Sequence, residues 1–324
     1  MSKHAPRIVF LDAATYGDIP LRSFTDRWSC TVHEVTGADE IRQRISGHSV
    51  VVTNKVPLDR TILHAPEARD LNLIAVAATG TDIIDREAAK ELNVKVCNVP
   101  GYATQSVGQF TMALILELAT SVGRYREAVK AGAWQQSRVF ALLTFATIEL
   151  RGKKLGIIGY GNIGKAVAEM GRASGMEILI AARPGSETYP GDRISIEQLF
   201  RDSDIVSLHC PLTPQTKNLI NKQSLSWMKP TAFLINTARG ALVDEEQLIE
   251  ALRQKTIAAA ALDVISREPP TADHPIIKAA AKLDNLIVTP HTAWSTREAR
   301  ERLLDEVEKN IAAFLAGTPR NVVV

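Results

Sequence analysis

Three residues in the second half of the sequence, Arg239, Glu268 and His291, have side chains whose chemistry suits a catalytic site. The planar guanidinium group of an arginine can form paired hydrogen bonds with a carboxylate or a carbonyl group. A histidine can give or take a proton near neutral pH. Each of the three follows an apolar run of strand type, and ligands bind at the carboxyl ends of strands in open α/β sheets. The set therefore indicates a site at one edge of a sheet.

Each of these residues, taken alone, also has a structural interpretation. Arg239 precedes Gly240 and fits a surface arginine beside a turn. Glu268 precedes two prolines, where a glutamate is usually a solvated loop residue. A single histidine is more often structural than catalytic. Their shared position just beyond the strands of one sheet favours the chemical interpretation.

A glycine-rich turn at residues 159–164, Gly-Tyr-Gly-Asn-Ile-Gly, indicates a dinucleotide. An apolar run of strand type precedes it, and apolar residues at helical spacing follow it. In such a unit Gly159 permits the tight turn, Gly161 lets the backbone approach a pyrophosphate, and Gly164 lets the helix pack against its strand. The free N–H groups at the start of the helix attract the anion. The alternative is a glycine-rich turn that holds no ligand.

Strand and helix patterns alternate along the chain, which is typical of βαβ units and a mostly parallel sheet. A break at residues 98–101 separates two such series, and one long apolar helix is expected at about 106–131. Strands are expected at residues 7–11, 31–35, 49–53, 73–77, 94–97, 155–158, 177–181, 205–208, 232–236, 258–262 and 286–288. The six from 155 onward would form a complete dinucleotide-binding sheet. The fold class expected is α/β, with two doubly wound parallel-sheet domains.

Helix boundaries can be placed from capping residues. Asp244, with Gln247 three residues later, is expected to cap a helix at 245–252. Ser295 and Glu298 form a capping box for the last helix, which Gly317 should end. Shorter helices are expected at 38–45, 86–92 and 196–200.

The composition is that of a globular protein with an ample core. The chain has 324 residues, of which 45% are hydrophobic and 23% charged, and its formal net charge is +2. Two domains are expected at this length. There is no basic run to suggest nucleic acid or a membrane surface, and no apolar stretch as long as a membrane span. Three scattered cysteines without metal spacing indicate reduced thiols, no metal site and a cytoplasmic location.

The ordered set of motifs resembles the D-2-hydroxyacid dehydrogenase family, including its glycerate dehydrogenase and hydroxypyruvate/glyoxylate reductase members. Residues 76–82, Val-Ala-Ala-Thr-Gly-Thr-Asp, are similar to the family's substrate-carboxylate loop, and 98–102, Asn-Val-Pro-Gly-Tyr, to its hinge. The glycine turn, Asn-Thr-Ala-Arg-Gly at 236–240, Leu-Asp-Val at 262–264 and Pro-His-Thr-Ala at 290–293 follow at family spacing. The resemblance covers almost the whole chain.

The resemblance implies a discontinuous first domain. Residues 1–101 and 294–324 would form a flavodoxin-like substrate domain, and residues 102–293 a Rossmann cofactor domain. The active site would lie between the two domains. Family members are typically homodimers, and the long helix after residue 104 is expected to take part in that contact.

The resemblance also implies a mechanism. A reduced nicotinamide would deliver hydride to a 2-keto acid, and His291 would protonate the carbonyl oxygen as general acid. Glu268 would orient the imidazole and favour its protonated form. Arg239 would hold the substrate carboxylate. The expected substrate contacts are Lys55, Ala78, Thr79, Gly80, Arg239 and His291.

The cofactor residues follow from the same resemblance, and Asp263 would bind the nicotinamide carboxamide. Where NAD-preferring members carry an acidic residue after the second strand, this chain has Ala182 followed by Arg183. An arginine there would attract a 2′-phosphate, so NADP(H) is favoured over NAD(H), although both could be accepted. The expected cofactor contacts are Gly159, Gly161, Asn162, Ile163, Gly164, Arg183, His209, Pro211, Thr216, Thr237, Ala238, Arg239, Asp263, His291 and Ala293.

Three classes of function remain at this stage. The first is reduction of a small 2-keto acid, hydroxypyruvate or glyoxylate, which Trp294 beside Ala293 favours by its likeness to glycerate dehydrogenases. The second is phosphoglycerate dehydrogenase. It is less favoured because many such enzymes carry a regulatory extension that is not expected in this sequence. The third is a non-enzymatic, corepressor-like dinucleotide sensor. Formate dehydrogenase is disfavoured because its site pairs the histidine with glutamine, where Glu268 stands here.

Overall fold

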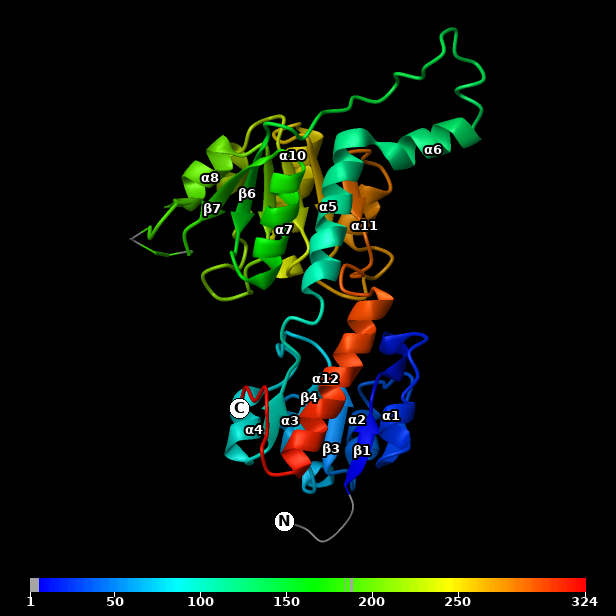
Figure 1. The fold of residues 1–324 in the computed structure, drawn as a ribbon, viewed down its shortest axis with the longest axis vertical. Coiled ribbons are helices and arrows are strands. Elements are labelled where there is room, and N and C mark those ends of the chain that lie inside the picture. Colours follow the sequence, from blue (N-terminus) through cyan, green and yellow to red (C-terminus); the bar gives the residue numbers. More distant parts are fainter. Residues whose placement is uncertain (1–5, 184, 187–188) are drawn as a thin grey trace. The chain divides into compact units, whose positions relative to one another are not determined.

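The computed structural model describes residues 6–183, 185–186 and 189–324 (Figure 1). It divides into two compact units. Unit 1 comprises Met1–Ala103 and Ser295–Val324, and unit 2 comprises Thr104–Trp294. Each unit is built on its own parallel sheet, so the expected pair of doubly wound α/β domains is confirmed.

Within its described residues, unit 1 has a five-stranded parallel sheet of order β2-β1-β3-β4-β5, the flavodoxin-like order. Strands β3 and β4 are buried along their whole length because helices cover the sheet. The strands are β1 Arg7–Phe10, β2 Ser29–Val32, β3 Val50–Thr53, β4 Leu73–Val76 and β5 Lys95–Cys97. The helices are α1 Arg22–Thr25, α2 Ile41–Ile45, α3 Arg60–Leu63, α4 Arg86–Glu91 and α12 Arg297–Leu315.

Unit 2 has, among its described residues, a seven-stranded parallel sheet of order β12-β11-β10-β9-β6-β7-β8. The strand order reverses between β6 and β9, which is the position where doubly wound sheets bind dinucleotides. The strands are β6 Lys154–Ile158, β7 Glu177–Ala181, β8 Arg193–Ile194, β9 Ile205–Leu208, β10 Phe233–Asn236, β11 Ala259–Leu262 and β12 Leu286–Val288. The helices are α5 Thr104–Thr120, α6 Val122–Lys130, α7 Asn162–Ala173, α8 Ile196–Asp202, α9 Lys222–Trp227, α10 Glu245–Arg253 and α11 Pro275–Ala280.

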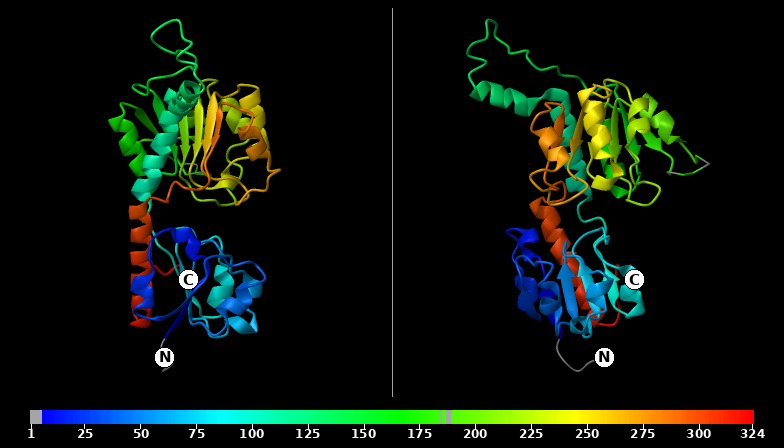
Figure 2. Two further views of the ribbon diagram at one scale, coloured as in Figure 1. Left: turned by 90° about the vertical axis from the view of Figure 1, so that its right-hand side faces the viewer. Right: turned by 180° about the vertical axis from the view of Figure 1, so that it is seen from behind.

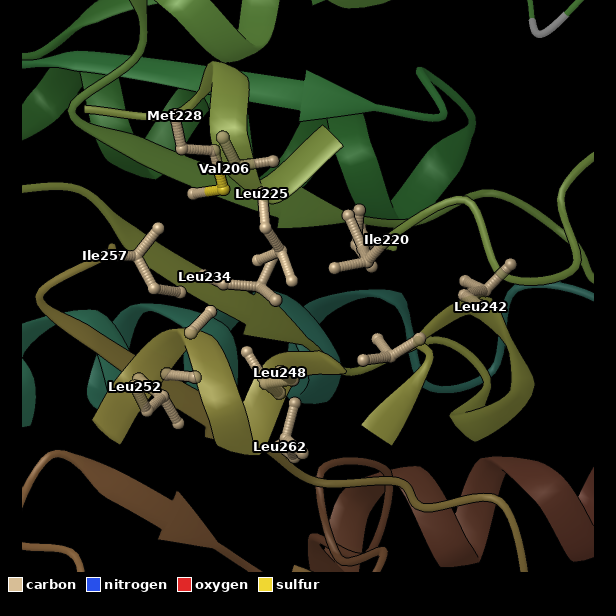
Figure 3. Packing of buried hydrophobic residues seen from close by; sticks show 14 of the residues in the cluster. Val206, Ile220, Leu225, Met228, Leu234, Leu242, Leu248, Leu252, Ile257 and Leu262 are labelled. Carbon is tan, nitrogen blue, oxygen red and sulfur yellow. The ribbon is translucent and has the colours of Figure 1, made fainter. Parts of the chain in front are cut away.

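Helices cover both faces of the unit 2 sheet (Figure 2). On one face α8 to α11 pack on the strands through buried side chains such as Leu225, Leu234 and Leu248 (Figure 3). On the other face α5 and α7 pack on the strands through residues such as Ile115 and Val167. Because both faces are buried, the strand ends are the exposed parts of the sheet where a site can form.

Several sequence-based boundaries were wrong. The expected helix at 106–131 is broken at Ser121, whose backbone adopts a left-handed conformation with φ of 54°, so it becomes α5 and α6. The strand expected at 31–35 is β2 at the sheet edge, which begins earlier and leaves Val35 70% exposed. The sheet of unit 2 also has β8, a two-residue strand that is too short to show a sequence pattern.

Capping was predicted correctly for one helix and placed one residue early for another. Asp244 caps α10 by accepting a 3.1 Å hydrogen bond from the Gln247 backbone N–H. The cap of α12 is Thr296 rather than Ser295, and its hydroxyl accepts from the Ala299 N–H. Helix α12 ends at Leu315, shortly before a glycine with positive φ, as expected.

In the described part of the chain no single helix is long and apolar enough to cross a membrane. Helices α5 and α6 pass that test only as a pair, bent by 58°. Much of α5 is buried within unit 2, as expected of a core helix.

Candidate functional site

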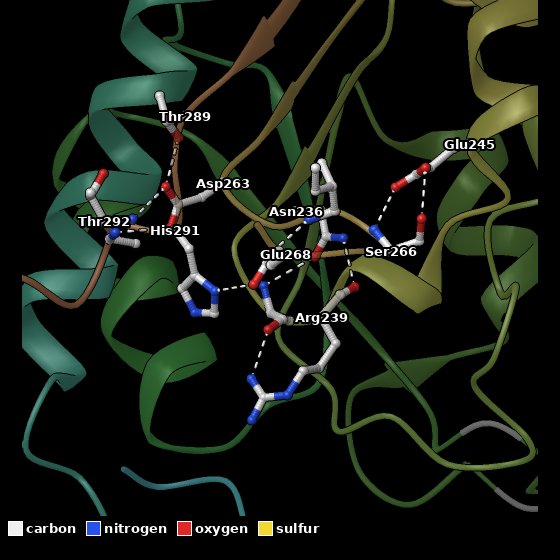
Figure 4. A network of polar contacts seen from close by, with 12 residues as sticks. Asn236, Arg239, Glu245, Asp263, Ser266, Glu268, Thr289, His291 and Thr292 are labelled. Carbon is white, nitrogen blue, oxygen red and sulfur yellow. Dashed lines mark hydrogen bonds and ion pairs between the residues drawn. The ribbon is translucent and has the colours of Figure 1, made fainter. Parts of the chain in front are cut away.

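His291 and Glu268 form a close pair at the carboxyl edge of the unit 2 sheet (Figure 4). The His291 Nδ1 and Glu268 Oε2 atoms lie 2.6 Å apart, and the side chains are 26% and 31% exposed. The other carboxylate oxygen, Oε1, accepts a 2.9 Å hydrogen bond from the Ile265 N–H. With Nδ1 engaged, Nε2 is the ring nitrogen that can meet a substrate oxygen.

Asp263 holds the segment that carries His291. This carboxylate follows β11, is 1% exposed, and lies beside the segment that follows the neighbouring strand β12. Its Oδ1 accepts from the Thr289 hydroxyl at 2.6 Å and the Thr292 N–H at 3.0 Å, while Oδ2 accepts from the Ala293 N–H at 2.8 Å. His291 itself has φ of 55°, and its N–H donates to the Asp263 carbonyl at 2.8 Å. Asp263 therefore fixes a turn whose backbone is unusual for a residue other than glycine.

A buried asparagine shapes the turn that carries Arg239. The Asn236 amide accepts from the Ala238 N–H at 3.0 Å and donates to the Arg239 carbonyl at 2.8 Å. The Arg239 side chain is half-buried and donates to the Ala238 carbonyl at 2.8 Å. A Cβ on Gly240 would lie 2.0 Å from the Ile265 carbonyl, so only glycine fits there. The arginine turn and the Glu268 loop are thus packed backbone to backbone.

The glycine turn has the geometry of an anion cradle. Gly159 has φ of +99°, and a Cβ there would lie 2.4 Å from the backbone of His209 and Cys210. A Cβ on Gly164 would lie 2.1 Å from the Gly159 carbonyl oxygen, so α7 packs closely on the turn. Gly161 precedes α7 without a side-chain cap, and a Cβ on it would meet nothing within 4 Å. Open space beside an uncapped helix start fits the pyrophosphate of a dinucleotide. The first residues of α7 are Asn162 and Ile163.

His209 lies beside this turn with a buried ring. Its Nε2 is 2.9 Å from the Ser207 hydroxyl, and its Nδ1 is buried without a hydrogen-bond partner in the described structure. Burial lowers the pKa of the His209 imidazole to about 3, so the ring is neutral near pH 7. A neutral ring adds no charge beside the glycine turn.

Other expected cofactor residues make contacts within the protein. The Thr216 hydroxyl donates to the Pro211 carbonyl at 2.7 Å, which closes the loop after β9. The Thr237 hydroxyl is 3.0 Å from that of Thr111 on α5. The carbonyl of Ala293 accepts from the Ser106 hydroxyl on α5 at 2.7 Å. The last two contacts hold the loops after β10 and β12 on α5.

Arg183 lies two residues after the end of β7 and is exposed, whereas Ala182 is buried. Its place at the end of the strand next to β6 is the one expected for a residue that contacts the adenosine ribose.

The expected substrate residues Lys55, Ala78, Thr79 and Gly80 belong to unit 1, where they follow β3 and β4. The Thr79 hydroxyl donates to the Val99 carbonyl at 2.9 Å, and Ala78 is buried. Lys55 is exposed on the loop after β3.

Sequence reasoning missed Asp12, which holds the Lys55 loop. Its carboxylate is 5% exposed and accepts hydrogen bonds from the N–H groups of Asn54, Lys55 and Val56 at 2.6 to 3.3 Å. The Thr53 hydroxyl donates to it as well, at 3.4 Å. Burial raises the pKa of the Asp12 carboxyl above its ordinary 3.8, against the lowering effect of these hydrogen bonds. The available signal was an aspartate directly after a buried strand.

A metal centre finds no support in the described residues, where no group of three or more His, Cys, Asp or Glu side chains could hold an ion.

Comparisons with known proteins find similar sequences and a similar fold. Residues 112–293 match the family model for the NAD binding domain of D-isomer specific 2-hydroxyacid dehydrogenases. The chain is 40% identical to a glycerate dehydrogenase from Methylorubrum extorquens, covering 98% of each chain. It is 36% identical to a hydroxypyruvate reductase from Blautia hydrogenotrophica, covering 98% of this chain and 99% of the relative. The fold matches the TT0316 protein of Thermus thermophilus with a TM-score of 0.85 and 34% identity, covering 98% of this chain and all of that one.

Proposed function

Because the chain belongs to the D-isomer specific 2-hydroxyacid dehydrogenase family, we propose that it reduces a small 2-keto acid, hydroxypyruvate or glyoxylate, to the D-2-hydroxy acid. The family makes the protein an oxidoreductase that uses a nicotinamide dinucleotide. The observation that carries the proposed chemistry is the 2.6 Å contact between His291 Nδ1 and Glu268. The similarity to a glycerate dehydrogenase and a hydroxypyruvate reductase supports the choice of substrate.

The catalytic roles in this proposal follow from the positions of the side chains. When bound, the reduced nicotinamide supplies a hydride to the carbonyl carbon of the substrate. His291 donates a proton from Nε2 to the carbonyl oxygen, so that the oxygen becomes the new hydroxyl group. Glu268 keeps the ring oriented by accepting from Nδ1. Arg239 binds the substrate carboxylate with its planar guanidinium group and so fixes the carbonyl for attack.

Unit 1 is proposed to be the substrate domain and unit 2 the cofactor domain. In unit 1, the backbone N–H groups of Thr79 and Gly80 are proposed to bind the other carboxylate oxygens, and Lys55 is proposed to line the same pocket. All three follow the carboxyl ends of strands, where open α/β sheets bind ligands.

Asp263 is proposed to serve the cofactor as well as the His291 turn. A carboxylate has about four acceptor sites, and three donors from residues 289–293 take up three of them. One site remains for the N–H of the nicotinamide carboxamide. Such a contact would fix which face of the nicotinamide meets the substrate.

NADPH is the proposed preferred cofactor, with NADH also accepted. The support is the exposed Arg183 beyond β7, preceded by an alanine instead of an acidic residue. An arginine there attracts a 2′-phosphate, whereas a carboxylate would repel it. The ratio of kcat/KM for NADPH over NADH should fall in Arg183→Ala. An unchanged ratio would show that Arg183 does not discriminate between the cofactors.

A homodimer is proposed, formed through α6 and the segment that follows it. Helix α6 has no buried residue, and the segment after it extends away from the unit 2 sheet (Figure 1). Large apolar side chains along this stretch are exposed, which is unusual unless a partner covers them. They are Val122, Val129, Trp134, Val139, Phe140 and Leu143. Light scattering should report a dimer for the wild type and a monomer for Phe140→Asp with Leu143→Asp.

A cytoplasmic location completes the proposal. Cys30, Cys97 and Cys210 are free thiols, which suits a reducing compartment.

A substrate panel tests the proposed function. Hydroxypyruvate, glyoxylate, pyruvate and 3-phosphohydroxypyruvate are each mixed with the protein and NADPH or NADH, and loss of absorbance is followed. We expect the highest kcat/KM for hydroxypyruvate or glyoxylate. A higher value for 3-phosphohydroxypyruvate would reassign the substrate, and no turnover of any of the four would contradict a 2-keto acid reductase.

A further inference from the structure

Glu245, the first residue of α10, holds the loop that carries Glu268. One of its carboxylate oxygens accepts from the Ser266 N–H at 2.6 Å, and the other accepts from the Ser266 hydroxyl at 2.9 Å (Figure 4). The Glu245 side chain is 10% exposed. Hydrogen bonds to a carboxylate are stronger than neutral ones, and two from one residue also fix its orientation.

The loop beyond Ser266 lies at the surface. Residues 266–273 are exposed and form no helix or strand, yet Glu268 must stay in place to orient His291. Ile265, next to Ser266, donates its N–H to Glu268 Oε1 at 2.9 Å. The loop is therefore fixed at Ser266. Because Ile265 precedes Ser266 in the chain, its N–H is held in place and in turn holds the Glu268 carboxylate.

The Glu268 loop also packs on the turn that carries Arg239. The backbone of Ile265 and Ser266 packs on Gly240, which directly follows Arg239. Glu245 lies five residues further along, at the start of the helix that this turn leads into. Two points, Gly240 and Glu245, thus hold the Glu268 loop against the segment that carries Arg239.

Local structure explains why a charged glutamate is stable here. Glu245 occupies the first turn of α10, where the helix dipole favours negative charge, and Asp244 caps the same helix. His274 lies on the other side, with its Nε2 3.7 Å from the Glu245 carboxylate and 3.5 Å from the Ser266 hydroxyl. Its side chain is 6% exposed and so covers the contact on that side.

We propose that Glu245 is a positioning residue for the reduction of the 2-keto acid, which acts by holding Ser266 so that Glu268 stays in register with His291 and Arg239. Glu245 touches neither substrate nor cofactor in this role. The inference rests on the proposed function, because Glu268 and His291 are the groups whose positions matter.

Kinetics of Glu245→Ala give the first test. Loss of both hydrogen bonds frees the loop, and misplacement of a catalytic group by about 1 Å can cost about 10²-fold in rate. We expect kcat for hydroxypyruvate to fall by about 10- to 100-fold, while the Kd for NADPH, measured by fluorescence, stays within about twofold. Glu245→Gln should recover part of the loss, because its amide oxygen still accepts from the Ser266 N–H.

Glu246→Ala is the matched control. Glu246 stands next to Glu245 in the same helical turn with the same charge, but it is exposed. Its kcat should equal that of the wild type. A wild-type kcat in Glu245→Ala, or an equal loss in Glu246→Ala, would overturn the proposal.

Proton NMR gives a test that does not depend on turnover. A short hydrogen bond between His291 Nδ1–H and Glu268 should give a far-downfield proton signal, assigned by its loss in Glu268→Gln. We expect the signal to disappear or broaden in Glu245→Ala and to persist in Glu246→Ala. An unchanged signal in Glu245→Ala would contradict the positioning role, even if the wild type reduced no 2-keto acid.

Ser266→Ala keeps the proposal testable if Glu245→Ala fails to fold. This variant keeps the hydrogen bond from the backbone N–H to Glu245 and loses only the one from the hydroxyl. We therefore expect a smaller fall in kcat, of about threefold to tenfold. A wild-type kcat together with an unchanged downfield signal in Ser266→Ala would overturn the proposal.

Discussion

Asp263 in unit 2 and Asp12 in unit 1 are buried carboxylates that hold a loop in the same way. Each follows a strand of a parallel sheet and accepts backbone N–H groups from the loop after the neighbouring strand. The loop held by Asp263 carries His291, and the loop held by Asp12 carries Lys55. Each also accepts a threonine hydroxyl, but Asp12 holds three successive N–H groups, whereas Asp263 holds two.

The two carboxylates hold loops with different proposed functions. The loop in unit 2 places His291, the proposed proton donor, whose position must be accurate for reaction to occur. The loop in unit 1 places a cation that is proposed to bind substrate. Loss of Asp263 should therefore affect kcat most, and loss of Asp12 should affect KM most.

Among changes to the groups that hold these loops, Asp263→Asn should have the largest effect. The new amide NH₂ is a hydrogen-bond donor and would face the backbone N–H groups that Asp263 accepts. The turn that holds His291 at positive φ would therefore relax. We expect kcat for hydroxypyruvate to fall by about 10²-fold. Asp284→Asn, at an exposed ion pair with Arg124, should leave kcat unchanged. A loss confined to KM in Asp263→Asn would remove the distinction drawn between the two carboxylates.

A smaller effect is expected for Asp12→Asn. The variant has one acceptor oxygen for three N–H groups, of which those of Asn54 and Val56 are buried. Each buried donor left unpaired costs about 1–3 kcal/mol. Hydrogen exchange of the amides of Asn54, Lys55 and Val56 should show a fall of that size in their free energy of opening. The KM for hydroxypyruvate should rise severalfold with little change in kcat. Exposed Asp26→Asn serves as control, and unchanged exchange at 54–56 would show that Asp12 does not hold the loop.

The smallest expected effect is an opposite response of the two units to acid. Burial raises the pKa of Asp12 above 3.8, so the folded state binds this proton more readily than the unfolded chain. Its contribution to stability therefore grows as pH falls through the raised pKa toward 3.8. Burial lowers the pKa of His209 from 6.5 to about 3, so its contribution to stability is lost as pH falls through that window.

Hydrogen exchange at pH 7 and pH 4.5 would measure this contrast. Between these values the free energy of opening of β9 should decrease by about 1–2 kcal/mol more in the wild type than in His209→Asn. The free energy of opening of residues 54–56 should respond in the opposite sense. Between pH 7 and pH 4.5 it should increase in the wild type relative to Asp12→Asn. The same pH response in wild type and variants would show that neither group titrates differently on folding.

Local sequence patterns predicted much of the fold. The glycine turn could be recognised because its spacing dictates a strand, a tight turn and a helix, and the Asp244 cap because it depends on residues only three positions apart. The break at Ser121 and the edge strand β8 could not be predicted. The left-handed residue at the break is a serine instead of the usual glycine, and β8 has only two residues.

The candidate site was predictable in its residues rather than in what holds them. Arg239, Glu268 and His291 stand at strand ends, which a sequence shows. The contact of Glu245 with Ser266 spans 21 positions, and that of Asp12 with Lys55 spans 43. Contacts at such separations arise only when the strands have paired, so a local pattern can mark Asp12 as following a strand but cannot name the loop that either carboxylate holds.

The most direct test of the account is the rate of hydroxypyruvate reduction by His291→Ala with saturating NADPH. Because this one ring is the proposed proton donor, kcat/KM should fall by about 10²–10⁴-fold, the usual cost of losing a general acid. The Kd for NADPH should change little. Turnover close to that of the wild type would contradict the assignment of His291 as the proton donor.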